Sequence, residues 1–124
     1  MDLGFDTVGN GTLIVYDHDP VLVTDPWLGG NLYFGAWQMS HEIPKEQKAS
    51  IGRAQYVWIS HGHPDHCHWQ SLERLRGKRI LLPDHRGSRI ADALEEEGFD
   101  VTVLEDRQWV RLSERIRVWT FSNA

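Results

Sequence analysis

The sequence predicts an α/β protein in which a mixed sheet carries its helices on one face. Two observations support this prediction: a β-rich beginning, and an alternation of strands and helices between residues 55 and 104. Residues 12–16 and 21–24 are rich in β-branched and aromatic side chains, and Asn10-Gly11 before the first run is a strong hairpin turn signal. We therefore expect the chain to begin with an antiparallel meander.

The segment from residue 25 to residue 50 has no regular hydrophobic period. Glycine and proline interrupt it between the aromatic residues Trp27, Tyr33, Phe34 and Trp37. Long segments without regular structure are usually functional or disordered, and the aromatic content argues against disorder. We expect a long aromatic loop here, with room for one short helix.

The second half of the chain alternates strands with helices. We expect helices at residues 69–76 and 88–97, where Gly77 and Gly98 stand as C-terminal caps. Strands are expected at residues 55–60, 79–82, 101–104, 108–112 and 116–121. These elements amount to a single domain over residues 1–124. Because the order of elements stops directly after a strand, we expect this domain to be incomplete at its C-terminus.

Composition narrows the classes of function and the compartment. The chain has a formal net charge of −5, and its Lys and Arg residues are scattered, which argues against nucleic-acid binding. Its apolar runs are far shorter than the roughly 20 residues that cross a bilayer, so we expect no membrane span. Cys67 is the one cysteine, so no internal disulfide can form and a cytoplasmic location is expected.

Four potential metal ligands lie within six residues, in the sequence His61-Gly62-His63-Pro64-Asp65-His66. Neutral imidazoles and a carboxylate suit Zn, Fe or Mn. His61 and His63 are two residues apart, so in extended backbone they project the same way. Pro64 bends the chain, which lets Asp65 and His66 face a second position. The loop therefore predicts two adjacent metal sites.

The alternative is a solvated polar loop whose histidines are only caps or surface groups. Against it, residues 56–59 before the loop are apolar, and a buried strand would give the site a rigid, dry wall. We interpret the two residues that follow the motif structurally, Cys67 as a buried inert thiol and His68 as a polar residue at a helix start.

This loop resembles the His-x-His-x-Asp-His signature of the metallo-β-lactamase superfamily. The signature stands in the place expected for that family, after a strand and before a helix. The early meander, the strand ending in Asp25-Pro26 and the order of elements from residue 3 to residue 121 also resemble the N-terminal αβ half of that fold. The loop from Asp25 to Pro44 is similar to the branch that contains CMP-N-acetylneuraminate hydroxylase and the ascorbate-phosphate lactonases.

The resemblance implies a role for each matching residue. His61 and His63 would bind the first of two divalent metal ions, and Asp65 and His66 the second, with zinc expected ahead of iron or manganese. Asp65 would also be catalytic, because it would orient a metal-bound water. Asp25 would hold a ligand by a hydrogen bond from outside the metal's own coordination shell.

The superfamily takes its remaining ligands from segments that would follow Ala124. A further His, a bridging Asp and a final His have no counterpart in this sequence, and His85 lies too early to match. Three nitrogens and one carboxylate leave two metals under-coordinated. We therefore expect a C-terminal half or a second chain to complete the metal site.

Aromatic residues of the long loop are candidates for a substrate cleft. Trp27 and Trp37 would line it, with His41 beside them, because ligand pockets combine aromatic rings with a few polar groups. The alternatives are packing of the two rings across the sheet edge and a solvated His41. The expected partner is a small-molecule substrate.

The motif predicts a hydrolase that uses a metal-bound hydroxide on a small ester, lactone, phosphodiester or amide. A second hypothesis is an oxygenase or other redox enzyme of the same fold in which iron replaces zinc. A third is a metal-binding module without turnover. The identity of the metal separates the first two hypotheses.

Overall fold

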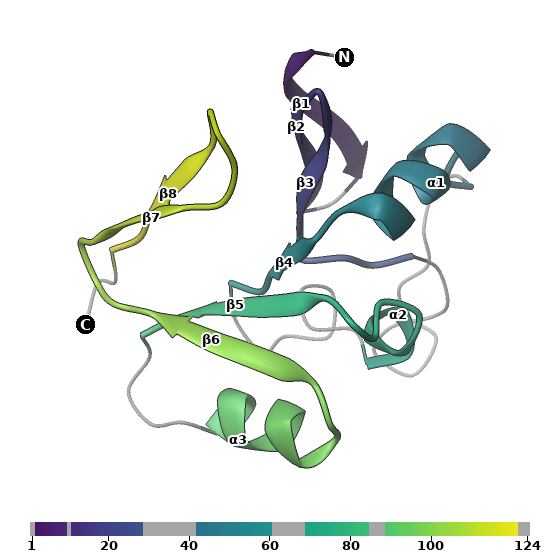
Figure 1. Ribbon diagram of the computed structural model, residues 1–124. Helices are drawn as coiled ribbons and strands as arrows, with labels where there is room; N and C mark the ends of the chain where they lie inside the picture. The colour runs from purple at the N-terminus through teal and green to yellow at the C-terminus, as the bar shows by residue number, and fades with distance from the viewer. Residues whose placement is uncertain (1, 10, 29–41, 61–68, 85–88, 122–124) are drawn as a thin grey trace.

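The computed structural model describes residues 2–9, 11–28, 42–60, 69–84 and 89–121. In them a six-stranded sheet has the strand order β1 to β6, and β7 and β8 form a separate two-stranded sheet (Figure 1). The strands are β1 (Leu3–Gly9), β2 (Thr12–Asp17), β3 (Asp19–Thr24), β4 (Tyr56–Trp58), β5 (Arg79–Pro83), β6 (Asp100–Leu104), β7 (Trp109–Arg111) and β8 (Arg117–Trp119). The helices are α1 (Lys45–Arg53), α2 (Trp69–Glu73) and α3 (Arg89–Glu96).

The large sheet is mixed, as the sequence predicts. β1, β2 and β3 pair antiparallel, which confirms the meander, and β3 to β6 pair parallel. The sequence prediction assigned no range to β1, because Gly4 and Gly9 break up its β-rich pattern. The three central residues of β5 are all buried, as expected for a parallel strand covered on both faces.

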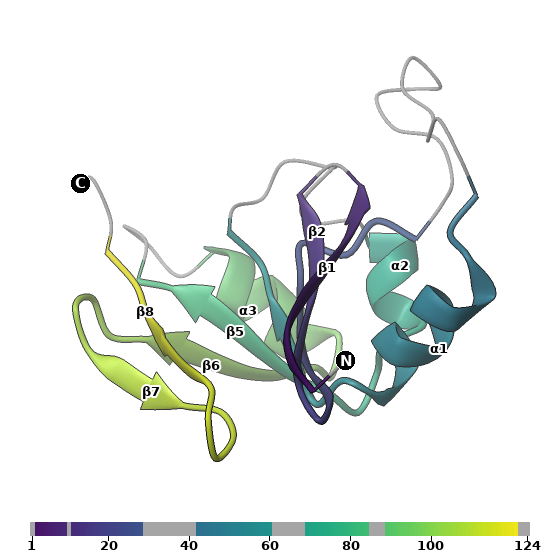
Figure 2. The same ribbon diagram turned by 90° about the horizontal axis from the view of Figure 1, so that it is seen from above.

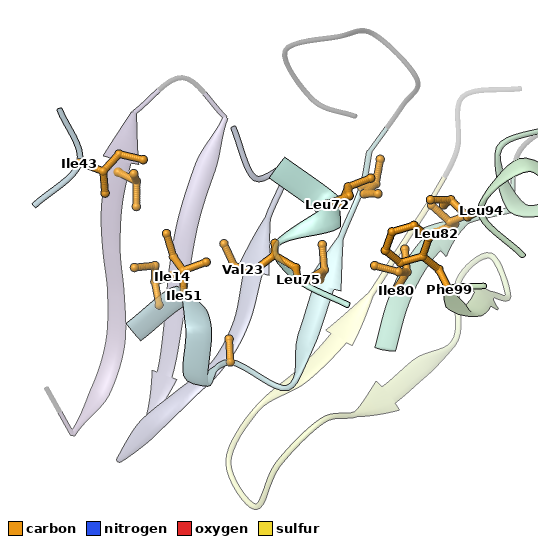
Figure 3. Close-up of a cluster of buried hydrophobic side chains, with 14 of the residues drawn as sticks. Ile14, Val23, Ile43, Ile51, Leu72, Leu75, Ile80, Leu82, Leu94 and Phe99 are labelled. Atoms are coloured by element: carbon orange, nitrogen blue, oxygen red, sulfur yellow. The ribbon is translucent and has the colours of Figure 1, made fainter. Parts of the chain in front are cut away.

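All three helices cover the same face of the sheet, which confirms the predicted layering. Their buried side chains join those of the strands in one hydrophobic cluster (Figure 3). Ile51 of α1 and Leu94 of α3 are 1% and 0% exposed, and Leu72 of α2 is also fully buried. This face therefore supplies the main core of the domain.

Helix ends follow the local signals in the sequence. Gly98 has a φ of 87°, and the N–H groups of Gly98 and Phe99 donate to the carbonyls of Glu95 and Leu94, the hydrogen-bond pattern of a Schellman motif. α2 is shorter than predicted, because beyond Glu73 the chain continues in tighter turns up to Gly77. α1 is the short helix allowed for in the long loop, although it runs to Arg53 and so extends beyond the expected limit of that loop.

The other face of the sheet is partly covered by the β7–β8 hairpin. Leu112 beside the hairpin joins Leu22, Leu81 and Leu104 of the sheet in a second hydrophobic cluster. Figures 1 and 2 show the hairpin on the side of the sheet away from the helices. Trp109 and Trp119 pair across the hairpin and are 58% and 42% exposed, so neither is a core residue among the described residues.

A group of ion pairs fastens the hairpin to the end of β2. The carboxylate of Asp17 accepts hydrogen bonds from Ser113 Oγ at 2.7 Å, from the backbone N of Arg115 at 2.9 Å and from Arg115 Nε at 2.6 Å. Arg115 also pairs with Asp2 at 3.0 Å. The Ser113 hydroxyl, then the Arg115 N–H and guanidinium, lower the pKa of Asp17 to about 2. The hairpin is therefore held by charge as well as by apolar contact.

No helix in the described part of the chain is both long enough and apolar enough to span a bilayer.

Candidate metal centre

The predicted metal loop follows the carboxyl end of β4, next to the carboxyl end of the parallel strand β3. In open α/β sheets, ligands bind beyond the carboxyl ends of the strands. Asp25 follows β3 directly, and Ser60 follows β4 with only Ile59 between. The described residues thus show the edge from which the loop begins.

Asp25 is joined to Ser60 by two hydrogen bonds. Its Oδ1 accepts from the backbone N of Ser60 at 2.7 Å, and its Oδ2 accepts from Ser60 Oγ at 2.8 Å. Asp25 is 5% exposed, and its own N–H donates to the carbonyl of Trp58 at 2.6 Å. The carboxylate therefore fixes the residue that immediately precedes His61.

The backbone of Asp25 lies in the left-handed region, with a φ of 39°. Aspartate tolerates this conformation better than most residues, yet it costs about 1 kcal/mol or more. Residues 25–28, called the turn below, are also held by Thr12, whose Oγ1 donates to the carbonyl of Asp25 at 2.8 Å. The same hydroxyl accepts from the backbone N of Trp27 at 3.3 Å, and Thr12 is only 1% exposed.

Ser71 contacts the far end of the same turn. Its Oγ accepts a hydrogen bond from the backbone N of Leu28 at 2.8 Å. Ser71 lies in α2, the helix that follows the predicted metal loop, and it is 2% exposed. Residues 25–28 are thus bonded both to the residue before the loop and to the helix after it.

The predicted ligands His61, His63, Asp65 and His66 lie outside the described residues. So do Trp37 and His41, as well as Cys67, His68 and His85. Within the described ranges, no three or more His, Cys, Asp or Glu residues gather closely enough to hold a metal ion. The ligand set therefore stays a prediction.

Two other predicted site residues are described. Asp25 lies beside the start of the loop and hydrogen-bonds to Ser60, a place that suits the predicted second-shell role. Trp27 is 5% exposed, so in the described part of the chain it is packed rather than open to solvent. Its role in a substrate cleft stays a prediction.

Sequence reasoning did not find Ser60, Thr12 or Ser71. Ser60 carried a weak signal, since it is the polar residue between an apolar strand and the motif. Thr12 reads as an ordinary β-branched strand residue, and Ser71 as one polar position of a short helix. Only the folded structure shows that the two hydroxyls meet the same four-residue turn.

The chain is similar in sequence to hydroxylases from other organisms. No protein-family model matches the chain. The chain is 30% identical over 102 residues to the cytidine monophosphate-N-acetylneuraminic acid hydroxylase of Danio rerio, a match of 77% of this chain and 17% of that protein. For the Asterias rubens hydroxylase, identity is 27% over 105 residues, or 80% of this chain and 16% of that protein. The chain thus spans about a sixth of the length of these relatives.

One solved structure has a similar fold. CmlA, a diiron β-hydroxylase from Streptomyces venezuelae, superposes with a TM-score of 0.65 at 21% sequence identity, covering 88% of this chain and 22% of that one. At this sequence identity, the similarity shows a common fold and nothing about function.

The fold, a mixed sheet with its helices on one face, agrees with the predicted N-terminal half of a metallo-β-lactamase fold. In sequence, the chain is similar to the cytidine monophosphate-N-acetylneuraminic acid hydroxylases. The similarity to the ascorbate-phosphate lactonases stays a prediction.

Proposed function

We propose that this chain is part of an iron-dependent hydroxylase that acts on a small molecule. The observation that carries the proposal is the motif at residues 61–66 in a chain whose relatives are named as hydroxylases. The structural neighbour, which is named as a diiron β-hydroxylase, supports iron rather than zinc as the metal. CMP-N-acetylneuraminic acid is the first substrate to test, since the relatives are named for it.

The donor set of the motif fits such a metal. Three imidazoles and a carboxylate are ligands that iron accepts in oxygenases. His61 and His63 would hold one ion, and Asp65 and His66 would hold the other. Two ions need more donors than these four residues supply, so other segments of the protein or a second chain would complete the centre. When bound, iron would supply the activation of dioxygen: one oxygen atom would enter a C–H bond and the other would leave as water, with two electrons and two protons from an external reductant.

Residues of this chain outside the ligand set position the ligands. Asp25 holds Ser60 by two hydrogen bonds, which fixes the backbone next to His61. Ile59 beside it is 0% exposed, so the start of the loop is anchored in the core. A buried anchor limits how far the first ligand can move when metal is absent.

A hydrolase with zinc is the second candidate, because the same motif can activate water. The relatives favour the hydroxylase over it, since the Danio rerio and Asterias rubens proteins and the structural neighbour CmlA are all named as hydroxylases. The third candidate, a metal-binding module without turnover, would bind its metal through the same ligands, so the ligand set alone does not separate it from the two enzymes.

Metal analysis after anaerobic purification tests the proposal. After expression in iron-supplemented medium without added zinc, we expect the protein to contain iron, and we expect His61→Ala and Asp65→Ala each to lose it. His18→Ala is the matched control, since His18 lies in the turn before β3 and its side chain is 77% exposed. Retention of zinc with exclusion of iron would overturn the hydroxylase and favour the hydrolase.

A further inference from the structure

Residues 25–28 contact both ends of the segment that carries the motif. The Asp25 carboxylate accepts from Ser60, the residue before His61. The Leu28 N–H donates to Ser71 Oγ, in the helix that begins at Trp69. In the sequence, residues 61–68 lie between Ser60 and α2. The turn at residues 25–28 is therefore bonded to the chain on both sides of the segment that carries the motif.

This turn is stiff and buried. Pro26 restricts its own φ to a narrow range and is less than 2% exposed. Asp25 and Trp27 are each 5% exposed. Thr12 adds a third point of attachment, because its hydroxyl donates to the carbonyl of Asp25 and accepts from the N–H of Trp27. A turn held in this way keeps a constant distance between Ser60 and Ser71.

The two hydroxyls bond to backbone groups of residues 25–28 from within the core. Loss of either hydroxyl would remove a partner from those backbone groups, at a cost of about 1–3 kcal/mol, and would loosen this segment. Thr12 is 1% exposed and Ser71 is 2% exposed, so each polar atom is placed deep in the domain. Both hydroxyls bond to residues 25–28, the segment that borders the start of the motif.

We propose that Thr12 and Ser71 are positioning residues for the metal centre, acting through residues 25–28 to set the spacing of Ser60 and α2. This inference rests on the proposed metal site. The first ligand pair, His61 and His63, follows Ser60, whereas the second, Asp65 and His66, lies nearer α2. A fixed spacing of Ser60 and α2 lowers the entropy cost of forming the proposed metal site, which raises the affinity for metal.

Titration with Co²⁺, followed by its visible absorption, tests the inference. Thr12→Val and Ser71→Ala each remove one hydroxyl, and we expect each to weaken Co²⁺ binding by about tenfold, as loss of an outer-shell partner does. Thr12→Ser keeps the hydroxyl and is expected to restore most of the affinity. Ser50→Ala is the matched control, because Ser50 is a 7% exposed serine in α1. It should bind Co²⁺ as the unchanged protein does.

Amide hydrogen exchange without metal supplies an independent readout. We expect faster exchange at the Leu28 amide in Ser71→Ala and at the Trp27 amide in Thr12→Val, while core amides of β5 stay protected. Unchanged Co²⁺ affinity in both variants, or an equal loss in Ser50→Ala, would overturn the positioning role and leave the metal site standing. Co²⁺ binding that survives His61→Ala would overturn the proposed site and the inference together.

Discussion

Two aspartates of this chain make similar hydrogen bonds in different surroundings. Asp25 accepts from a serine hydroxyl and a backbone N–H, both of Ser60. Asp17 also accepts from a serine hydroxyl and a backbone N–H, those of Ser113 and Arg115, and in addition from a guanidinium. Asp25 lies at the edge that leads into the motif, and Asp17 lies where the β7–β8 hairpin meets the sheet.

The difference separates a contact beside the predicted metal loop from a contact that holds the hairpin to the sheet. Asp17 joins residues 96 and 98 positions away in sequence; its own side chain is 5% exposed and that of its partner Arg115 is 37% exposed, so water and salt reach the pair from the guanidinium side. Asp25 meets Ser60 through a neutral hydroxyl and a backbone N–H. The Asp17 contact should respond to salt, and the Asp25 contact should respond to changes in packing and polarity.

Removal of the Asp25 side chain should have the largest effect on stability. Asp25→Ala leaves the N–H and hydroxyl of the half-buried Ser60 without these acceptors, and loss of a hydrogen-bond partner costs about 1–3 kcal/mol where the donor is buried and less where water can replace it. We expect the free energy of unfolding, measured by urea denaturation, to fall by about 2 kcal/mol. A fall of less than about 1 kcal/mol would show that water replaces the carboxylate easily.

Loss of Arg115 should free the hairpin without unfolding the sheet. Arg115→Ala removes the pairs with both Asp2 and Asp17. We expect faster hydrogen exchange and several-fold faster proteolysis in residues 109–119, with the protection of β3 to β5 unchanged. Arg117→Ala is the control, since Arg117 lies over the Trp109 ring in the hairpin itself. Equal loosening in both variants would contradict the fastening role.

Acid should act on Asp17 before it acts on the core. The pKa of Asp17 is lowered from 3.8 to about 2, chiefly by the Ser113 hydroxyl and then by the Arg115 N–H. A lowered folded pKa means that this contact contributes its full stability above pH 3.8 and loses it as the pH falls through 2. The Arg115 amide shift, followed by NMR, should therefore titrate in that window. In Asp17→Asn this titration should be absent; its persistence would assign it to another group.

Salt should produce the smallest change. High ionic strength screens exposed pairs, and the Asp2–Arg115 pair has side chains that are 61% and 37% exposed. In about 1 M NaCl we expect modestly faster amide exchange at the hairpin. At Ser60, whose acceptor is buried, we expect no change in the exchange rate. Hydrogen exchange with and without salt makes the measurement. A salt response at Ser60 as large as that at Arg115 would remove the distinction between the two aspartates.

Most of the fold could be predicted, because local patterns and tertiary packing agree. Gly98 marks the end of α3, and the apolar runs at β3 and β5 become strands buried on both faces. β1 was harder, since Gly4 and Gly9 weaken its pattern and only pairing with β2 stabilises it. The position of the β7–β8 hairpin depends on Asp17 and Arg115, which are far apart in sequence.

The candidate site also has a part that the sequence predicts and a part that it does not. Its ligand set at residues 61–66 is local and could be proposed from the motif alone. The residues proposed to position it could not, because Thr12, Asp25 and Ser71 come from three separate elements and meet only in the fold. The motif predicts zinc ahead of iron; the proposed function prefers iron because CmlA is named as a diiron enzyme.

Metal affinity in two isosteric variants tests the account most directly. Asp25→Asn and Asp17→Asn each replace a carboxylate with an amide of the same shape, one at each of the two contacts. Under anaerobic conditions, we predict that Asp25→Asn weakens Fe²⁺ binding by about tenfold or more, as loss of a second-shell carboxylate does, while Asp17→Asn leaves it unchanged. Equal Fe²⁺ affinity in the two variants would contradict the claim that the edge around Asp25 serves a metal centre.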